Sequence, residues 1–266
     1  MRMSSLSTLN LKRVVHLFRM DLRRLLHGKA FYAMVAVSVF IPVMMLTQMS
    51  EIRDIATFIG SDGASGGGFG AGMNLSILVV LTGMLLCIYI GGEYSTGFIK
   101  NIITAHANKL DYILAKLMVA SICTATFFLA YLITLFAVGG AMGVPAGAFG
   151  VGGLVLYVIE KLLLSVPMTA LMIAVALVFR SGYGWSMMFI CIAATGIVTL
   201  SAQAGLRMLG LGPIADILSF TVTGASSFAT LAPSATSLVV IMLVSAAWTL
   251  VWLLVADRLM SKRDVL

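Results

Sequence analysis

Long apolar runs separated by short polar segments make up most of this chain. An α-helix rises about 1.5 Å per residue, so about 20 apolar residues cross the roughly 30 Å hydrocarbon layer of a bilayer. The pattern therefore predicts an all-α membrane protein with six transmembrane helices. We place the spans at residues 31–49, 75–92, 113–138, 162–179, 185–206 and 236–256.

Composition and charge agree with a lipid solvent. The 266 residues are 61% hydrophobic and 10% charged, whereas soluble domains carry roughly 25% charged residues. The net charge of +7 does not indicate nucleic-acid binding, because the basic residues flank the apolar runs. With six spans, 14 of the 17 Lys and Arg residues fall on one side, and only Arg53, Lys161 and Arg207 on the other. This excess predicts a multi-pass protein of the bacterial plasma membrane with both termini in the cytoplasm.

The polar and apolar positions of residues 11–27 alternate with a helical period. Their apolar residues fall within one sector of about 120°, and their basic residues occupy the other side. Such a helix can lie in the headgroup plane as an anchor, or it can also frame a docking surface for a partner. The basic residues of the predicted interfacial helix are Lys12, Arg13, His16, Arg19, Arg23 and Arg24, with His27 beyond them.

Two parts of the chain depart from a simple series of spans. Glu160 and Lys161 lie inside an apolar run, so we place them at the outer interface, where Lys161 can extend towards water. Glu160 is the one candidate for a substrate or ion site. Residues 207–235 are broken by glycine and proline, which predicts short re-entrant helices between spans five and six. We divide the chain into an amphipathic connecting helix (1–30), a transmembrane domain (31–257) and a cytoplasmic tail (258–266).

Catalytic patterns are absent from the sequence. All three histidines lie outside the predicted spans, no HExxH pattern occurs, and the glycine-rich residues 65–70 are not followed by Gly-Lys-Ser/Thr. We therefore expect no catalytic residue, metal or cofactor on this chain. The predicted spans carry almost no charge, which favours an energy source on another polypeptide over a secondary carrier or channel. A scaffold or intramembrane enzyme is a third class, which the lack of buried catalytic groups disfavours.

The polar segment from Glu93 to Lys116 joins predicted spans two and three on the basic side. We expect the chain to turn at Gly91-Gly92 and at Gly97, and residues 98–105 to form a short helix. Such a helix could seat in a groove of a soluble partner, although an ordinary solvated loop is an equal reading of the same residues.

This segment resembles a signature of the ABC-2-type transporter permeases. Residues 93–100, Glu-Tyr-Ser-Thr-Gly-Phe-Ile-Lys, are similar to the family's Glu-Tyr/Phe-x-x-Gly pattern after span two. Residues 114–117, Leu-Ala-Lys-Leu, resemble the opening of the family's third span. The chain departs from the family at residues 105–109, where many members carry a proline and an arginine.

The resemblance implies a permease subunit of an ABC exporter that works with a separate ATPase subunit, on which ATP and Mg would bind. It also implies pairing with a second copy or a related permease. The cargo would be an amphipathic or hydrophobic substrate such as an antimicrobial peptide, drug or lipid. We expect Glu93 to bond backbone amides or a basic group, and Lys100 to face the partner or lipid phosphates. The residues expected to couple to the ATPase are Glu93, Tyr94, Thr96, Gly97, Phe98, Lys100, Asn101, His106 and Lys109.

Overall fold

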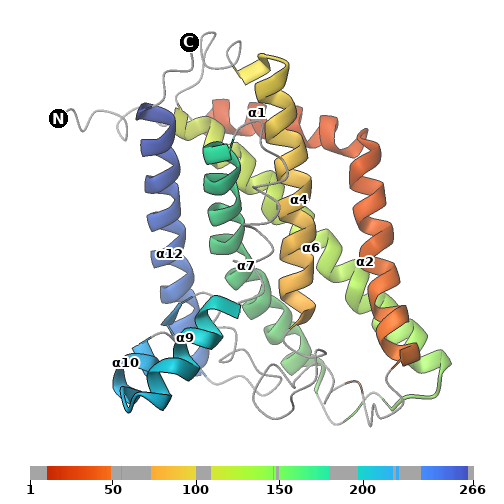
Figure 1. The fold of residues 1–266 in the computed structure, drawn as a ribbon. Helices are drawn as coiled ribbons and strands as arrows, with labels where there is room; N and C mark the ends of the chain where they lie inside the picture. The colour runs from red at the N-terminus through yellow and green to blue at the C-terminus, as the bar shows by residue number, and fades with distance from the viewer. Residues whose placement is uncertain are drawn as a thin grey trace.

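A computed structural model describes residues 11–48, 55, 73–99, 109–145, 147, 150–179, 197–217, 220–221 and 235–262. Regular structure in these residues is helical throughout (Figure 1). The described part contains five helices long and apolar enough to cross a membrane. They are α2 (Lys29–Gln48), α4 (Met73–Ser95), α6 (Lys109–Ala141), α7 (Val151–Phe179) and α12 (Ala235–Lys262).

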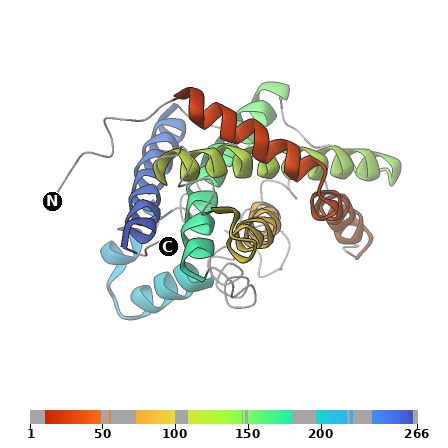
Figure 2. The same cartoon turned by 90° about the horizontal axis from the view of Figure 1, so that it is seen from above.

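A short amphipathic helix, α1 (Leu11–Leu26), lies across one end of this bundle, and its last turn leads through Gly28 into α2. Figure 1 shows α1 roughly perpendicular to the long helices, and Figure 2 shows it along one edge of the bundle. The helix predicted at residues 11–27 is therefore present. We refer to this end of the molecule as the α1 end.

The structure lengthens several predicted spans. α7 begins at Val151 rather than at residue 162, so Glu160 and Lys161 lie within the helix. α4 continues through Gly91 and Gly92 to Ser95, so the turn expected at the two glycines is wrong. Two helical glycines cost about 1 kcal/mol each relative to alanine, and the burial of the neighbouring Ile90 side chain, worth about 1.5–3 kcal/mol, offsets that cost.

The predicted fifth span falls mostly on residues 180–196, which lie outside the described residues. Its last part forms α9 (Ile197–Met208), which is followed by the short helix α10 (Gly212–Ile217). Both helices lie at the end opposite α1 (Figure 1). Trp248 of α12 donates a hydrogen bond from Nε1 to the carbonyl of Phe220 at 3.0 Å, so the chain beyond α10 returns against α12.

Packing centres on α6 and α7. One apolar cluster joins α4, α6, α7 and α12, and a second joins α1, α2, α4 and α6. α7 and α12 run side by side in the same direction, because Ser237 lies against Glu160 and Ser245 Oγ donates to the carbonyl of Leu163. The ends of α4 and α7 and the beginning of α6 therefore meet at the α1 end, close to the end of α12 (Figure 1).

Candidate functional site

The end of α4 positions Glu93 at the α1 end of the bundle. The helix stops because Gly97 adopts a φ of 69°, a left-handed conformation that glycine reaches without steric cost. The amide of Thr96 still bonds the carbonyl of Gly92 at 3.1 Å, and its hydroxyl donates to the same carbonyl at 2.8 Å. Glu93 thus lies in a well-defined last turn, directed into the bundle.

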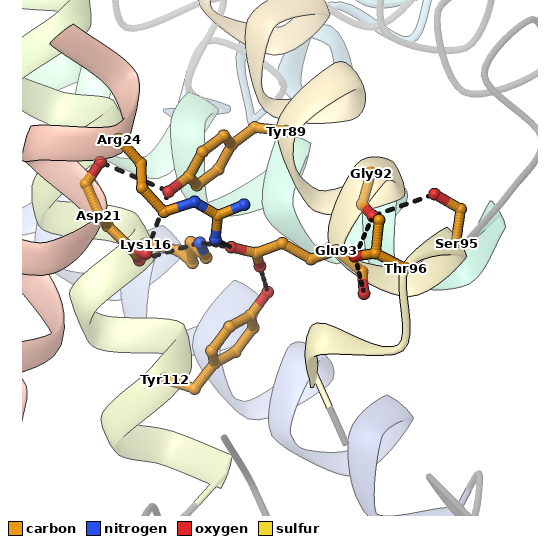
Figure 3. Close-up of polar contacts among 9 residues, drawn as sticks. All are labelled: Asp21, Arg24, Tyr89, Gly92, Glu93, Ser95, Thr96, Tyr112 and Lys116. Carbon is orange, nitrogen blue, oxygen red and sulfur yellow. Dashed lines mark hydrogen bonds and ion pairs between the residues drawn. The ribbon is translucent and has the colours of Figure 1, made fainter. Parts of the chain in front are cut away.

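Glu93 is fully buried and accepts three charged or polar contacts (Figure 3). Lys116 Nζ of α6 lies 2.8 Å from Oε1, and Arg24 of α1 lies 3.0 Å from the same atom. Tyr112 of α6 donates its hydroxyl to Oε2 at 2.6 Å. The expectation that Glu93 bonds a basic group is met by two basic groups from two different helices.

A second carboxylate completes the arrangement. Asp21 is buried on α1, and its Oδ2 lies 2.8 Å from Lys116 Nζ. Tyr89 of α4 donates to Asp21 Oδ1 at 3.1 Å. We call Asp21, Arg24, Glu93 and Lys116 the ion cluster. Its two acids and two bases cancel in charge, which keeps the desolvation cost of burial within reach of the Coulombic gain.

Aromatic rings enclose the two cations. Lys116 Nζ lies 4.0 Å from the ring centroid of Tyr89, and the Arg24 guanidinium lies 4.4 Å from that of Phe98. Cation–π contacts of this kind add about 0.5–2 kcal/mol each. Because Phe98 immediately follows the turn at Gly97, Arg24 contacts both sides of that turn. The ion cluster therefore connects α1, α4, α6 and the first residues beyond α4.

Lys109, the first residue of α6, makes a separate connection. Its Nζ donates to the carbonyl of Met260 near the end of α12 at 3.0 Å. A helix leaves its last carbonyls without intrahelical donors, and a lysine there also complements the negative end of the helix dipole. Asp111, two residues later, is buried, and neither of its oxygens has a hydrogen-bond partner among the described residues.

The residues predicted to couple to an ATPase divide into two groups. Glu93, Tyr94, Thr96, Gly97 and Phe98 gather at the end of α4, and Lys109 begins α6. Lys100, Asn101 and His106 lie outside the described residues, as does most of the short helix expected at 98–105.

The sequence reasoning did not find Asp21, Tyr89 and Tyr112. One signal for Asp21 was present, since it is the single acid of residues 11–27 and lies in the sector of Phe18 and Leu25, away from most of the basic residues. Nothing in the sequence indicated its partner on α6.

Glu160 and Lys161 occupy a second buried polar position, on α7. Ser237 of α12 donates to Glu160 Oε1 at 3.4 Å. Lys161 is buried, and its Nζ lies 5.2 Å from the ring centroid of Tyr157. The expectation that Lys161 extends towards water is therefore wrong, because the earlier start of α7 provides an aromatic neighbour one turn away.

The basic residues of α1 have separate environments. Lys12, Arg13, His16, Arg19 and Arg23 are exposed. Arg24 is partly exposed but directs its guanidinium to Glu93. The basic residues of this helix are therefore not equivalent: Arg24 belongs to the ion cluster, and the other five are exposed.

An interfacial helix, several membrane-length helices and a buried ion cluster at the turn after α4 define a multi-pass membrane protein. A family model described as ABC-2 family transporter protein matches residues 17–196, more than half of the chain and the whole of the ion cluster. The chain belongs to this family of ABC transporter membrane proteins. No curated protein sequence matches the chain.

Proposed function

We propose that this chain is the permease subunit of an ABC exporter and that a separate ATPase subunit drives it from the cytoplasm. The observation that carries this proposal is the ion cluster. Through buried contacts of 2.8 Å to Lys116 and a partly exposed contact of 3.0 Å to Arg24, the ion cluster attaches the turn after α4 to α6 and α1. A displacement of Glu93 would therefore act directly on α1, α4 and α6.

The proposed mechanism follows from these connections. ATP and Mg would bind on the partner ATPase and supply the energy for closing its dimer, and residues 93–109 of this chain would move with the ATPase surface. Glu93 passes the movement to Lys116 on α6 and to Arg24 on α1. The long helices then change between inward-open and outward-open arrangements. Buried ion pairs suit this task because their geometry is demanding and they hold the helices in register.

The proposed topology has six spans and cytoplasmic termini. Its support is the parallel arrangement of α7 and α12. Two parallel membrane helices require the chain to cross back between Phe179 and Ala235. The distribution of Lys and Arg favours the α1 end as the cytoplasmic one.

The proposed substrate is amphipathic or hydrophobic, such as an antimicrobial peptide, a drug or a lipid. Support comes from the long helices, whose described residues present large exposed apolar side chains and few charges. A second copy of this chain or a related permease would complete the pathway. α2 and α12 leave most of their surface uncovered in the single chain, which gives such a copy a place to pack.

The test is ATP-driven transport by the permease and its ATPase, co-purified from the native membrane and reconstituted in liposomes. We expect Glu93→Gln to leave ATP hydrolysis in place and to lower the transport obtained per ATP. Gly97→Pro provides a second variant, because proline cannot adopt a positive φ and the space around Gly97 is open. Because this space is open, the added side-chain atoms should leave the packing of the long helices unchanged.

Glu160→Gln is the matched control, since it neutralises a buried carboxylate in the first half of α7, away from the α1 end. An ATP-driven exporter keeps its coupling in this variant. Recovery of the protein without any ATPase, with ATP-independent transport that Glu160→Gln abolishes, would identify a secondary carrier and exclude the proposal.

A further inference from the structure

The surface of α1 divides into three faces. At about 100° per residue, Val14, Phe18, Asp21 and Leu25 share one sector, and three of these four side chains are buried. Their neighbours are α2, α4 and α6. This sector is the one that fastens α1 to the rest of the molecule.

The opposite side of α1 carries only basic residues. Its sector lies about 170° from the buried one by the same helical geometry, and all of its members are exposed. We call this set the basic stripe. It consists of Lys12, His16, Arg19, Arg23 and His27.

A third, apolar face lies between the other two. Leu11, Val15, Leu22 and Leu26 share it. Leu11 is 70% exposed and Leu26 41% exposed, so the contacts of α1 with the bundle leave this face partly uncovered. An apolar face beside a basic one is the arrangement of helices that lie in the membrane interface, with one face on acyl chains and the other on headgroups.

The position of α1 favours lipid over protein as the occupant of the basic stripe. α1 is joined through Gly28 to the first residue of α2, so it lies at the level where that span enters the bilayer. Figure 2 shows α1 along an edge of the bundle, with α6 on its inner side. Because the buried sector of α1 faces this contact, helical geometry turns the basic stripe away from the bundle, whereas a soluble ATPase would dock on the end of the molecule.

We infer that the basic stripe binds the headgroups of anionic phospholipids in the cytoplasmic leaflet. Three permanent cations, Lys12, Arg19 and Arg23, meet the headgroup phosphates, and His16 and His27 add hydrogen-bonding groups. The same helix carries Asp21 and Arg24 of the ion cluster. Anionic lipid therefore holds α1 in the position from which it contacts Glu93 and Lys116. This inference rests on the cytoplasmic location of α1 in the proposed function.

The test measures lipid retention by the full-length permease purified without its ATPase. The protein is exchanged into mixtures of phosphatidylglycerol and phosphatidylethanolamine, and the retained lipids are counted by native mass spectrometry. Each basic residue near an anionic surface contributes about 1 kcal/mol. We therefore expect the variant K12Q/R19Q/R23Q to bind phosphatidylglycerol roughly a hundredfold more weakly than the wild type, and the wild-type preference to fall at high salt.

Two controls keep the result specific. R19K/R23K retains the charge and should retain the preference, and Arg13→Gln removes an exposed cation outside the basic stripe and should change little. An unchanged preference in the triple variant overturns the inference. A separate preparation from membranes that contain the ATPase tests the alternative: a triple variant that keeps the lipid preference but no longer co-purifies with the ATPase also overturns the inference, because the basic stripe would then be a protein-docking surface. The lipid measurement needs no ATPase, so its failure is distinguishable from failure of the proposed function.

Discussion

The side chains of the ion cluster are buried to different extents, and their contributions to the free energy of unfolding differ accordingly. The side chains of Lys116 and Glu93 are fully buried, whereas that of Arg24 is 42% exposed. Breaking a buried pair by removing one partner costs about 3–5 kcal/mol, but an ion pair that reaches solvent is worth about 0–1 kcal/mol. Lys116 also contacts both Asp21 and Glu93.

We predict that Lys116→Met destabilises the protein far more than Arg24→Gln. Removing Lys116 leaves two buried carboxylates, Asp21 and Glu93, without their shared cation, and the expected loss is about 3–5 kcal/mol. Arg24→Gln should cost about 1 kcal/mol or less, because solvent screens that pair. Thermal unfolding of the purified permease in one detergent measures both. Equal losses would contradict the assignment of Lys116 as the central cation.

Asp111 leads to the opposite prediction for a neighbouring carboxylate. Its oxygens are buried without a hydrogen-bond partner among the described residues. The helix dipole at the start of α6 contributes about 0.3–1 kcal/mol, less than the several kcal/mol needed to desolvate a charge. Asp111→Asn should therefore raise the free energy of unfolding by about 1 kcal/mol. A marked loss of stability on the same thermal assay would mean that the carboxylate has a cationic partner.

At the scale of single elements, the end of α4 determines the geometry of the candidate site. α4 extends through two glycines and stops at a third, and these glycines have different backbone conformations. Gly92 is helical with open space around it, whereas Gly97 has a φ of 69° and equally open space. Because an added Cβ would meet no neighbour at either position, replacing each glycine by alanine tests the backbone conformation and not crowding.

We predict opposite effects for Gly92→Ala and Gly97→Ala. Alanine at position 92 should stabilise the last turn of α4 by up to about 1 kcal/mol through helix propensity. Alanine at position 97 should cost about 1–2 kcal/mol, because an L-residue is strained at positive φ. Hydrogen exchange of the amides of Ser95 and Thr96 measures both local effects. Slower exchange in both variants would contradict the turn at Gly97.

The sequence predicted the helices better than their limits. Apolar runs of sufficient length fixed the existence of α2, α4, α6, α7 and α12. Two boundaries that were predicted from charged residues and from glycines are wrong. The cost of a buried charge or of a glycine in a helix depends on its neighbours in the fold, which the sequence does not show. Glu160 and Lys161 are tolerated inside α7 through Ser237 and Tyr157, and Gly91 and Gly92 continue α4 because neighbouring Glu93 is buried in the ion cluster.

Partners in the ion cluster could not be predicted from sequence for a related reason. Arg24 and Glu93 are 69 residues apart, and no local periodicity specifies such a pairing. The signature around Glu93 indicated that the turn mattered, but not what held it. Only the packing of α1 across α6 brings Asp21 to Lys116.

At the scale of the whole molecule, the parallel course of α7 and α12 determines which side of the membrane each end of the bundle faces in the proposed topology. α9 and α10 lie at the end opposite α1. Met208 at the end of α9 is 88% exposed, and His16 of α1 is exposed at the other end. In the proposed topology the two positions therefore lie on opposite sides of the membrane.

We predict that Met208→Cys reacts from outside intact cells with a membrane-impermeant maleimide, in a background lacking the three native cysteines. His16→Cys should react only after the cells are opened, because the distribution of Lys and Arg favours the α1 end as the cytoplasmic one. Mass tagging of the labelled protein gives the result directly. Reaction of both cysteines on the same side would require an even number of crossings between residues 16 and 208. The proposed topology has five crossings there, so this result would contradict it.

Residues 93 and 109 lie on α4 and α6, and of their hydrogen bonds and ion pairs among the described residues only that of Lys109 reaches α12. Glu93 is held to α1 and α6 by the ion cluster, whereas Lys109 Nζ holds the carbonyl of Met260 on α12. A pull on the residues between them would consequently produce torque rather than simple translation. α12 would rotate against α4, and the far ends of these long helices would sweep through a larger arc than the ends where the pull is applied.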